Sequence, residues 1–230
     1  MSFQINLDEV DVDGAIREAA HEASGDTRLA FLKKAGLAGG AAMSGGAILA
    51  ALAPSAFAAG GGRPPASFGA GDVGILNYAL TLEYLEAAFY NGASAANLPL
   101  GSQAASFLKV VTKDENAHVK FLKTALGSKA AAEPKFDFKG ANTNAEMFMK
   151  TSQVLENTGV HAYSGQALNI KSPAYVKAAI SILTIEARHA SVIGLLNEPA
   201  GEDIAPNGPF DTPLTASQVL AAVKGTGFIV

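Results

Sequence analysis

Residues 115–118 read Glu-Asn-Ala-His and residues 186–189 read Glu-Ala-Arg-His, so both follow the pattern Glu-x-x-His. Both copies lie within long stretches that are typical of helices. On a helix, residues three positions apart share one face, a turn apart. The sequence therefore predicts two helices that each present a carboxylate and an imidazole side by side.

Four long helical stretches are predicted after residue 70, and no stretch reads convincingly as a strand. They run from about Asp72 to Tyr90, from Ser102 to Leu126, from Thr143 to about Leu168, and from the cap–proline pair Ser172-Pro173 to just before Pro199. Asp72 and Ser102 are suitable N-caps, and Asn91-Gly92 predicts the end of the first helix. Thr143 and Glu146 offer a capping box for the third.

The connections predict how these helices pair. The first and last connections are short, which suits antiparallel neighbours. Between Gly127 and Thr143 lies a longer segment, which could reach roughly 50 Å at about 3.3 Å per residue. A helix of about 25 residues is only about 37 Å long, so this segment can run the length of a bundle. The sequence thus predicts an all-α, ferritin-like four-helix bundle, made of two antiparallel hairpins with one long crossover.

The ends of the chain differ from the bundle. Residues 1–59 form a polar arm that turns basic, then an uncharged Ala/Gly-rich stretch ending in Ala56-Phe57-Ala58, which predicts an export signal. Its basic flank, residues 27–33, resembles a twin-arginine signal, with Leu29 in place of the second arginine. We expect residues 60–71 to be a Gly/Pro-rich linker, 72–198 the bundle, and 199–230 a covering tail whose short last helix is capped by residues 215–218.

Localisation follows from this signal as an expectation. We expect an exported protein, periplasmic or secreted, without stable membrane insertion once the signal is cleaved. A retained membrane anchor is the alternative, since the uncharged stretch is long enough to span a bilayer. Its many glycines and Pro54 make a poor spanning helix, which favours cleavage.

Each predicted helix carries a glutamate near its midpoint. These are Glu83, Glu115, Glu156 and Glu186, and the second and fourth helices add His118 and His189. The first two glutamates are 32 residues apart and the last two are 30 apart, as if one hairpin had been used twice. In a bundle, the four midpoints would lie in one cross-section.

Carboxylates and imidazoles in an apolar core need partners. A lone buried carboxylate costs several kcal/mol or becomes neutral. No basic residue stands between Arg63 and Lys109, so protein cations are scarce. Two metal ions would supply the missing positive charge. The pattern also matches the known di-iron or di-manganese carboxylate site, in which two helices each provide one glutamate and the other two each provide Glu-x-x-His. We therefore predict two metal ions, iron favoured over manganese.

A chance surface pattern is the alternative, because charged residues on a helix usually face water. The residues that share a face with Glu83 and Glu186 are apolar or small instead. They are Ala79, Leu80, Ala87 and Tyr90 around the first, and Ile182, Leu183, Ala190 and Ile193 around the second. A third Glu-x-x-His, at residues 18–21, has no partner carboxylates, and we interpret it as coincidence.

Nearby residues leave several roles open. Glu86 lies one turn after Glu83, rotated by about 60°, and either replaces it as a ligand or accepts a hydrogen bond behind it. His161 points elsewhere, which favours a core or surface role. Tyr90 and Tyr163 each follow a proposed ligand by seven residues. They either hydrogen-bond within the site, donate electrons, or are ordinary core tyrosines, and the sequence favours the last role.

Four segments carry a resemblance to a known family. They are Leu-Asn-Tyr-Ala-Leu-Thr-Leu-Glu-Tyr-Leu-Glu at 76–86 with Phe89-Tyr90, Asp-Glu-Asn-Ala-His at 114–118, Leu-Glu-Asn-Thr-Gly-Val at 155–160 with Ala162-Tyr163, and Ile-Glu-Ala-Arg-His-Ala at 185–190. Over residues 68–198 the chain resembles the ferritin-like domain family, in the branch of bacterial ferritin-like and plant desiccation-related proteins. The resemblance implies the metal ligands Glu83, Glu115, His118, Glu156, Glu186 and His189.

Two functions are compatible with these features. We expect an exported dinuclear iron or manganese protein that reacts with oxygen or peroxide and, if it is an enzyme, is an oxidoreductase. The alternative is a non-catalytic stress- or desiccation-protective protein in which metal is absent or structural. Iron storage in a cage is a weaker third possibility, since no segment indicates a cage-forming surface.

Composition excludes other classes. The chain has no cysteine, which rules out a disulfide scaffold, a thiolate metal site and a cysteine nucleophile. Its formal charge of -4 argues against a broad nucleic-acid interface. With 49% hydrophobic residues it can fill a sizeable core.

Overall fold

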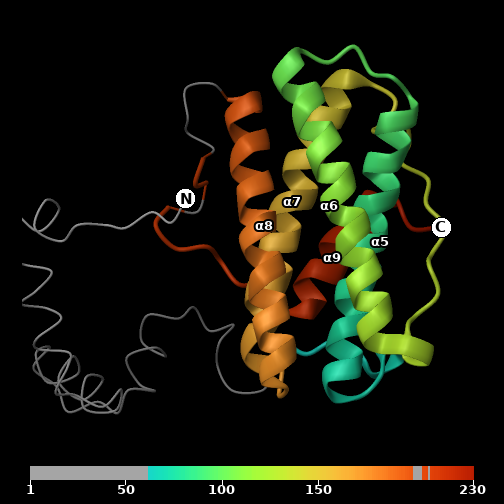
Figure 1. Cartoon of the computed structure of the whole chain (residues 1–230), viewed down its shortest axis with the longest axis vertical. Helices are drawn as coiled ribbons and strands as arrows, with labels where there is room; N and C mark the ends of the chain where they lie inside the picture. The colour runs from blue at the N-terminus through green and yellow to red at the C-terminus, as the bar shows by residue number, and fades with distance from the viewer. Residues whose placement is uncertain (1–61, 199–203, 207) are drawn as a thin grey trace, which may run out of the picture. The chain divides into compact units, whose positions relative to one another are not determined.

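Four long helices form the bundle in the computed structural model, which describes residues 62–198, 204–206 and 208–230 (Figure 1). They are α5 (Gly71–Ala95), α6 (Ser102–Leu126), α7 (Ala145–Gln166) and α8 (Pro173–Asn197). The 3₁₀ turns η2 (Ala66–Phe68), η3 (Gly127–Lys129) and η4 (Ala167–Asn169) flank them, and α9 (Ala216–Thr226) follows. The predicted arm and export signal at residues 1–59 lie outside the described residues.

The helices pair as two hairpins. α5 packs along α6 and α7 along α8, while α6 against α8 and α5 against α7 join the two pairs. The segment from the end of α6 to the start of α7 runs along the length of the bundle (Figure 1). In the described part of the chain, the only β pairing is a single bridge between Phe136 and Ile229. The predicted all-α ferritin-like bundle with one crossover and a short C-terminal helix is confirmed.

Asn77 fixes the start of the crossover. Its buried side chain donates to the carbonyl oxygens of Phe68 and Lys129, at 2.9 and 3.0 Å, and accepts from the Ala131 amide at 2.8 Å. One amide group therefore satisfies three backbone groups from two loops. Such a fully bonded buried amide holds both loops against α5.

The predicted N-cap of the first helix, Asp72, and its predicted end at Asn91-Gly92 were both wrong. Asp72 lies inside the first turn of α5, and its carboxylate accepts from the amides of Lys171 and Ser172 at 2.9 and 2.8 Å. It therefore ties α5 to the link before α8. Gly92 does not end α5 either: a Cβ there would lie 2.2 Å from Nδ2 of Asn142, so the glycine makes room for the crossover.

The expected N-caps of the second and third helices were wrong. The N-cap of α6 is Gly101 and not Ser102, and that of α7 is Asn144, whose side chain accepts from the Met147 amide, and not Thr143. Ser172 precedes α8, with proline in its first turn, as predicted. Residues 215–218 cap the last helix as predicted, and their hydrogen bonds form a complete capping box.

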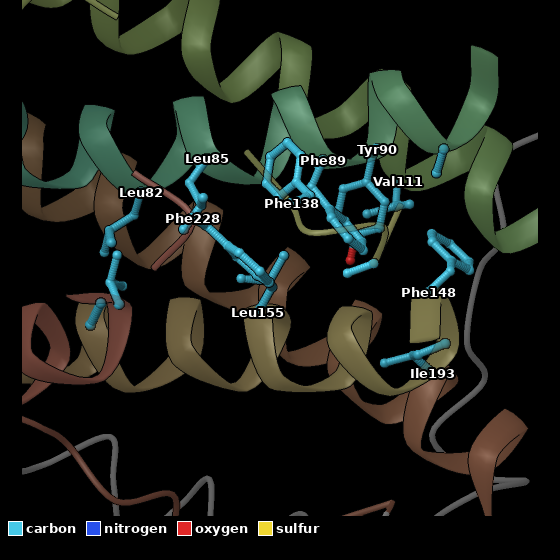
Figure 2. Packing of buried hydrophobic residues seen from close by; sticks show 14 of the residues in the cluster. Leu82, Leu85, Phe89, Tyr90, Val111, Phe138, Phe148, Leu155, Ile193 and Phe228 are labelled. Carbon is cyan, nitrogen blue, oxygen red and sulfur yellow. The ribbon is translucent and has the colours of Figure 1, made fainter. Parts of the chain in front are cut away.

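The largest apolar cluster lies between α5, α7 and the C-terminal segment. Figure 2 shows Leu82, Leu85, Phe89 and Tyr90 of α5 together with Phe148 and Leu155 of α7, Ile193 of α8, Phe138 of the crossover and Phe228. Val219 and Val223 of α9 belong to the same cluster. The crossover and α9 thereby cover the side of the bundle formed by α5 and α7.

By length and composition alone, α8 could span a membrane, with 39% of its most apolar window buried. A core helix of a bundle passes the same test. Near its midpoint α8 carries Glu186 and His189, both buried against the other helices.

Candidate metal centre

The six residues expected as ligands come together between the four helices. Glu83 comes from α5, Glu115 and His118 from α6, Glu156 from α7, and Glu186 and His189 from α8. The four glutamates have 0% exposure, and the two histidines are buried with 9% and 6% exposed. The bundle thus encloses them in one cluster.

The cluster contains two overlapping groups of candidate ligands. Group A is Glu83, Glu115, His118 and Glu186, and group B is Glu115, Glu156, Glu186 and His189. Within each group, one ligand atom per residue lies within 4.8 Å of the others. Because Glu115 and Glu186 belong to both groups, the geometry offers two adjacent positions that share two carboxylates.

Both imidazoles turn Nδ1 toward the carboxylates. His118 Nδ1 lies 3.0 Å from Glu115 Oε2 and 3.2 Å from both Glu83 Oε2 and Glu186 Oε1. His189 Nδ1 lies 3.1 Å from Glu115 Oε1 and 3.2 Å from Glu156 Oε2. Each Nδ1 therefore stands among the oxygens of its own group, where a cation could be held by all of them.

Two tyrosines orient the glutamates that belong to one group only. The Tyr90 hydroxyl, from α5, donates to Glu156 Oε1 on α7, and the Tyr163 hydroxyl, from α7, donates to Glu83 Oε1 on α5. Each bond occupies one oxygen of its glutamate and leaves Oε2 for the cluster. These tyrosines hydrogen-bond within the site and are not ordinary core residues, the role that the sequence favoured.

The buried oxygen and nitrogen atoms that lack hydrogen-bond partners indicate whether metal ions fit the cluster. The buried atoms without a hydrogen-bond partner include Glu83 Oε2, Glu115 Oε1, Glu156 Oε2, both oxygens of Glu186, and His189 Nδ1. Buried polar atoms without partners are costly and rare in folded proteins. Here they converge, and carboxylate oxygens with imidazole nitrogens are suitable ligands for iron and manganese. The cluster fits metal ions.

Without cations the cluster must hold protons. Burial and the neighbouring carboxylates raise the pKa of Glu186 well above its usual range, and burial raises the pKa of Glu115 to about 7. Burial opposes charge on the imidazole of His189, but Glu115 and Glu156 outweigh it and raise its pKa to about 11. The pKa of His118 is raised in the same way by three glutamates.

Glu86 and His161 lie outside both groups. Glu86 is buried, its Oε1 has no hydrogen-bond partner, and burial with the nearby carboxylates raises its pKa well above the usual range. The geometry thus places Glu83 in group A and Glu86 beside the cluster as a fifth carboxylate. His161 is half-buried and contributes to neither group.

Sequence reasoning missed two residues that contact the cluster. Asp114 Oδ2 lies 3.3 Å from His189 Nε2, on the side of the ring away from the carboxylates. At Gly159, a Cβ would lie 2.7 Å from Glu186 Oε2, so a side chain there would force that carboxylate to shift. Signals for both existed, since Asp114 directly precedes a proposed ligand and Gly159 occupies the repeat position of Glu86.

A groove of about 770 Å³ lies between α6 and α8. Phe107, Val110 and Val192 belong to its mainly apolar walls, and Asp114 and His189 also line it. α9 and the crossover cover the opposite side, so this groove borders the cluster on the α6–α8 side, where it reaches His189.

The metal-free protein should lose stability as the pH rises from about 5 to 9. A carboxyl whose pKa rises on folding, such as Glu115 from 4.5 to about 7, favours the folded state at low pH and less so as the pH passes through that interval. His189, raised from 6.5 to about 11, contributes stability below pH 6.5 that is lost toward pH 11. The titrations of Glu115 and His189 therefore both lower the stability of the metal-free protein as the pH rises.

Thermal unfolding of chelator-treated protein across this pH range measures the effect. Metal-loaded protein should show the opposite slope, because metal ions displace protons from their ligands. The Glu115→Gln variant, which removes one titrating group, should show a shallower slope without metal. A metal-free melting temperature that rises steadily from pH 5 to 9 would contradict this account.

Comparison with known proteins agrees with this geometry. The model of the family described as ferritin-like domain matches residues 71–198, more than half of the 230 residues and the whole of α5 to α8. None of the curated proteins compared with the chain matches it. With the family's bundle and a buried carboxylate–histidine cluster at its centre, the chain belongs to the ferritin-like domain family.

Proposed function

We propose that the protein binds two ions of iron or manganese in groups A and B and uses them in redox reactions with oxygen or peroxide. The convergent buried carboxylate oxygens carry this proposal, because in the described part of the chain their close partners are the two histidine Nδ1 atoms, which cannot satisfy all of them. Iron is preferred over manganese, since sites with oxygen and nitrogen ligands bind Fe²⁺ more tightly than Mn²⁺.

Each residue has a defined part in this proposal. Glu115 and Glu186 would help to hold both ions, Glu83 and Glu156 would each help to hold one, and both histidines would bind through Nδ1. When bound, iron or manganese supplies one-electron redox steps and Lewis acidity. The two tyrosine hydroxyls each donate a hydrogen bond to the outer oxygen of a single-position glutamate, and the apolar core around them keeps bulk water out.

Metal content tests the proposal. Full-length protein expressed with iron and manganese supplied should contain close to two ions per chain, measured by elemental analysis. Glu115→Gln should lose most of this metal, because the substitution replaces a charged carboxylate that belongs to both groups by a neutral amide. Glu133→Gln, at an exposed glutamate of the crossover, is the matched control and should keep it. Wild-type protein without stoichiometric metal would overturn the proposal.

Reactivity is measured separately on the loaded protein. Ferrous oxidation or peroxide consumption above that of the free metal would support redox function. Bound metal without any turnover would favour the alternative, a protective protein with a structural metal.

The groove between α6 and α8 supports access from that side. Ser106 is exposed and lines the groove, so Ser106→Trp should obstruct it and slow reaction with a bulky organic hydroperoxide several-fold, with less effect on hydrogen peroxide. Metal content should stay at the wild-type value. Ala105→Trp, also exposed on α6 but outside the groove, is the control. Equal slowing by both variants, or by neither, would argue against this route.

We also propose that the protein acts outside the cytoplasm. The proposal rests on the uncharged segment ending in Ala56-Phe57-Ala58 with its basic flank. N-terminal sequencing of protein recovered from the exported fraction should find a start just after Ala58. Recovery of intact chain from the cytoplasm alone would count against export, and intact chain in the membrane fraction would indicate a retained anchor.

A further inference from the structure

The cluster is built on an internal repeat. Glu83 of α5 corresponds to Glu156 of α7, and the Glu-x-x-His of α6 corresponds to that of α8. The tyrosine contacts repeat as well, since each tyrosine binds the glutamate of the other hairpin. Groups A and B therefore have the same composition, with one histidine and three glutamates each.

The repeat breaks at the residue before each Glu-x-x-His. In α6 this residue is Asp114, and in α8 it is Ile185. Asp114 Oδ2 lies 3.3 Å from His189 Nε2, within reach of an Nε2–H that donates to it. An isoleucine has no acceptor, and in the described part of the chain His118 Nε2 makes no hydrogen bond. Only the histidine of group B has a carboxylate behind it.

A carboxylate behind a metal-binding imidazole has two effects. It holds the proton on Nε2, so that the Nδ1 lone pair faces the metal position and the ring is fixed in orientation. It also makes the imidazole a more basic ligand, and loss of such a partner typically costs roughly 10–100-fold in metal affinity. His189 gains both effects, whereas His118 gains neither.

We propose that the two metal positions are unequal, and that Asp114, as a positioning residue for His189, makes group B the tighter one. The first ion therefore enters group B and the second enters group A. This inference rests on the proposed two-metal function. A second break in the repeat, Glu86 against Gly159, does not distinguish the positions by contact, because Glu86 belongs to neither group.

Titration of metal-free, full-length protein with Mn²⁺ tests the inference, with free Mn²⁺ measured by electron paramagnetic resonance. Wild-type protein should bind in two distinguishable steps. Asp114→Ala should weaken the tighter step by roughly 10–100-fold and leave the weaker step near its wild-type value. In Asp114→Asn, the affinity of the tighter step should lie between those of the wild type and of Asp114→Ala, because the amide oxygen still accepts a hydrogen bond but carries no charge.

The reciprocal variant adds the missing carboxylate. Ile185→Asp should tighten the weaker step about 10-fold or more and bring the two steps together, whereas Ile185→Asn should do so less. Glu133→Gln should titrate like the wild type. If Asp114→Ala does not fold, as judged by circular dichroism, Ile185→Asp decides the question because it retains Asp114.

The outcomes separate this inference from the proposed function. No uptake of Mn²⁺ by wild-type protein would overturn the two-metal proposal and this inference with it. Uptake of two ions in equal steps, unaltered by Asp114→Ala, would overturn the inference alone. So would an Ile185→Asp variant that folds and leaves the weaker step unchanged.

Discussion

Burial of five carboxylates and two imidazoles at one level of a four-helix bundle is the constraint on which the rest of the structure depends. Without cations, several of these carboxylates must take up protons, because five carboxylates outnumber the two imidazoles even when both imidazoles are charged. The two tyrosine hydroxyls each take one outer oxygen, and the inner oxygens remain for each other or for cations. Cations between those oxygens would relieve desolvation and repulsion together.

The topology explains how such a cluster forms from one chain. Two hairpins joined by a crossover along the bundle bring the midpoints of all four helices to one level, so each hairpin provides a Glu helix and a Glu-x-x-His helix. The crossover and α9 then cover the α5–α7 side. The histidines lie on α6 and α8, and the open groove between those helices includes His189 in its lining. The chain thus covers the α5–α7 side of the cluster, whereas the α6–α8 side keeps a groove that reaches His189.

Periodicity and spacing were sufficient to predict the helices, their pairing and the six residues that the bundle brings together, because those features repeat along single helices. They were insufficient where a role depends on a contact between helices. Asp72 looks like a local cap but binds the link before α8, and Gly92 looks like a stop but admits Asn142. The bonds of Tyr90 and Tyr163 cross from one hairpin to the other, so spacing along either helix could not reveal them.

Stability alone does not account for the cluster. Buried ion networks are weak contributors to stability, and apolar side chains of similar volume often make a bundle more stable. Leucines at these positions would remove the unsatisfied oxygens and extend the apolar core that already surrounds them. The cluster thus costs free energy in the metal-free chain, and its atoms are nevertheless held by tyrosine bonds, by Asp114 and by the space at Gly159. Such support around costly groups is the arrangement that a ligand-binding centre requires, since the surrounding residues keep donor atoms in place before the ligand arrives.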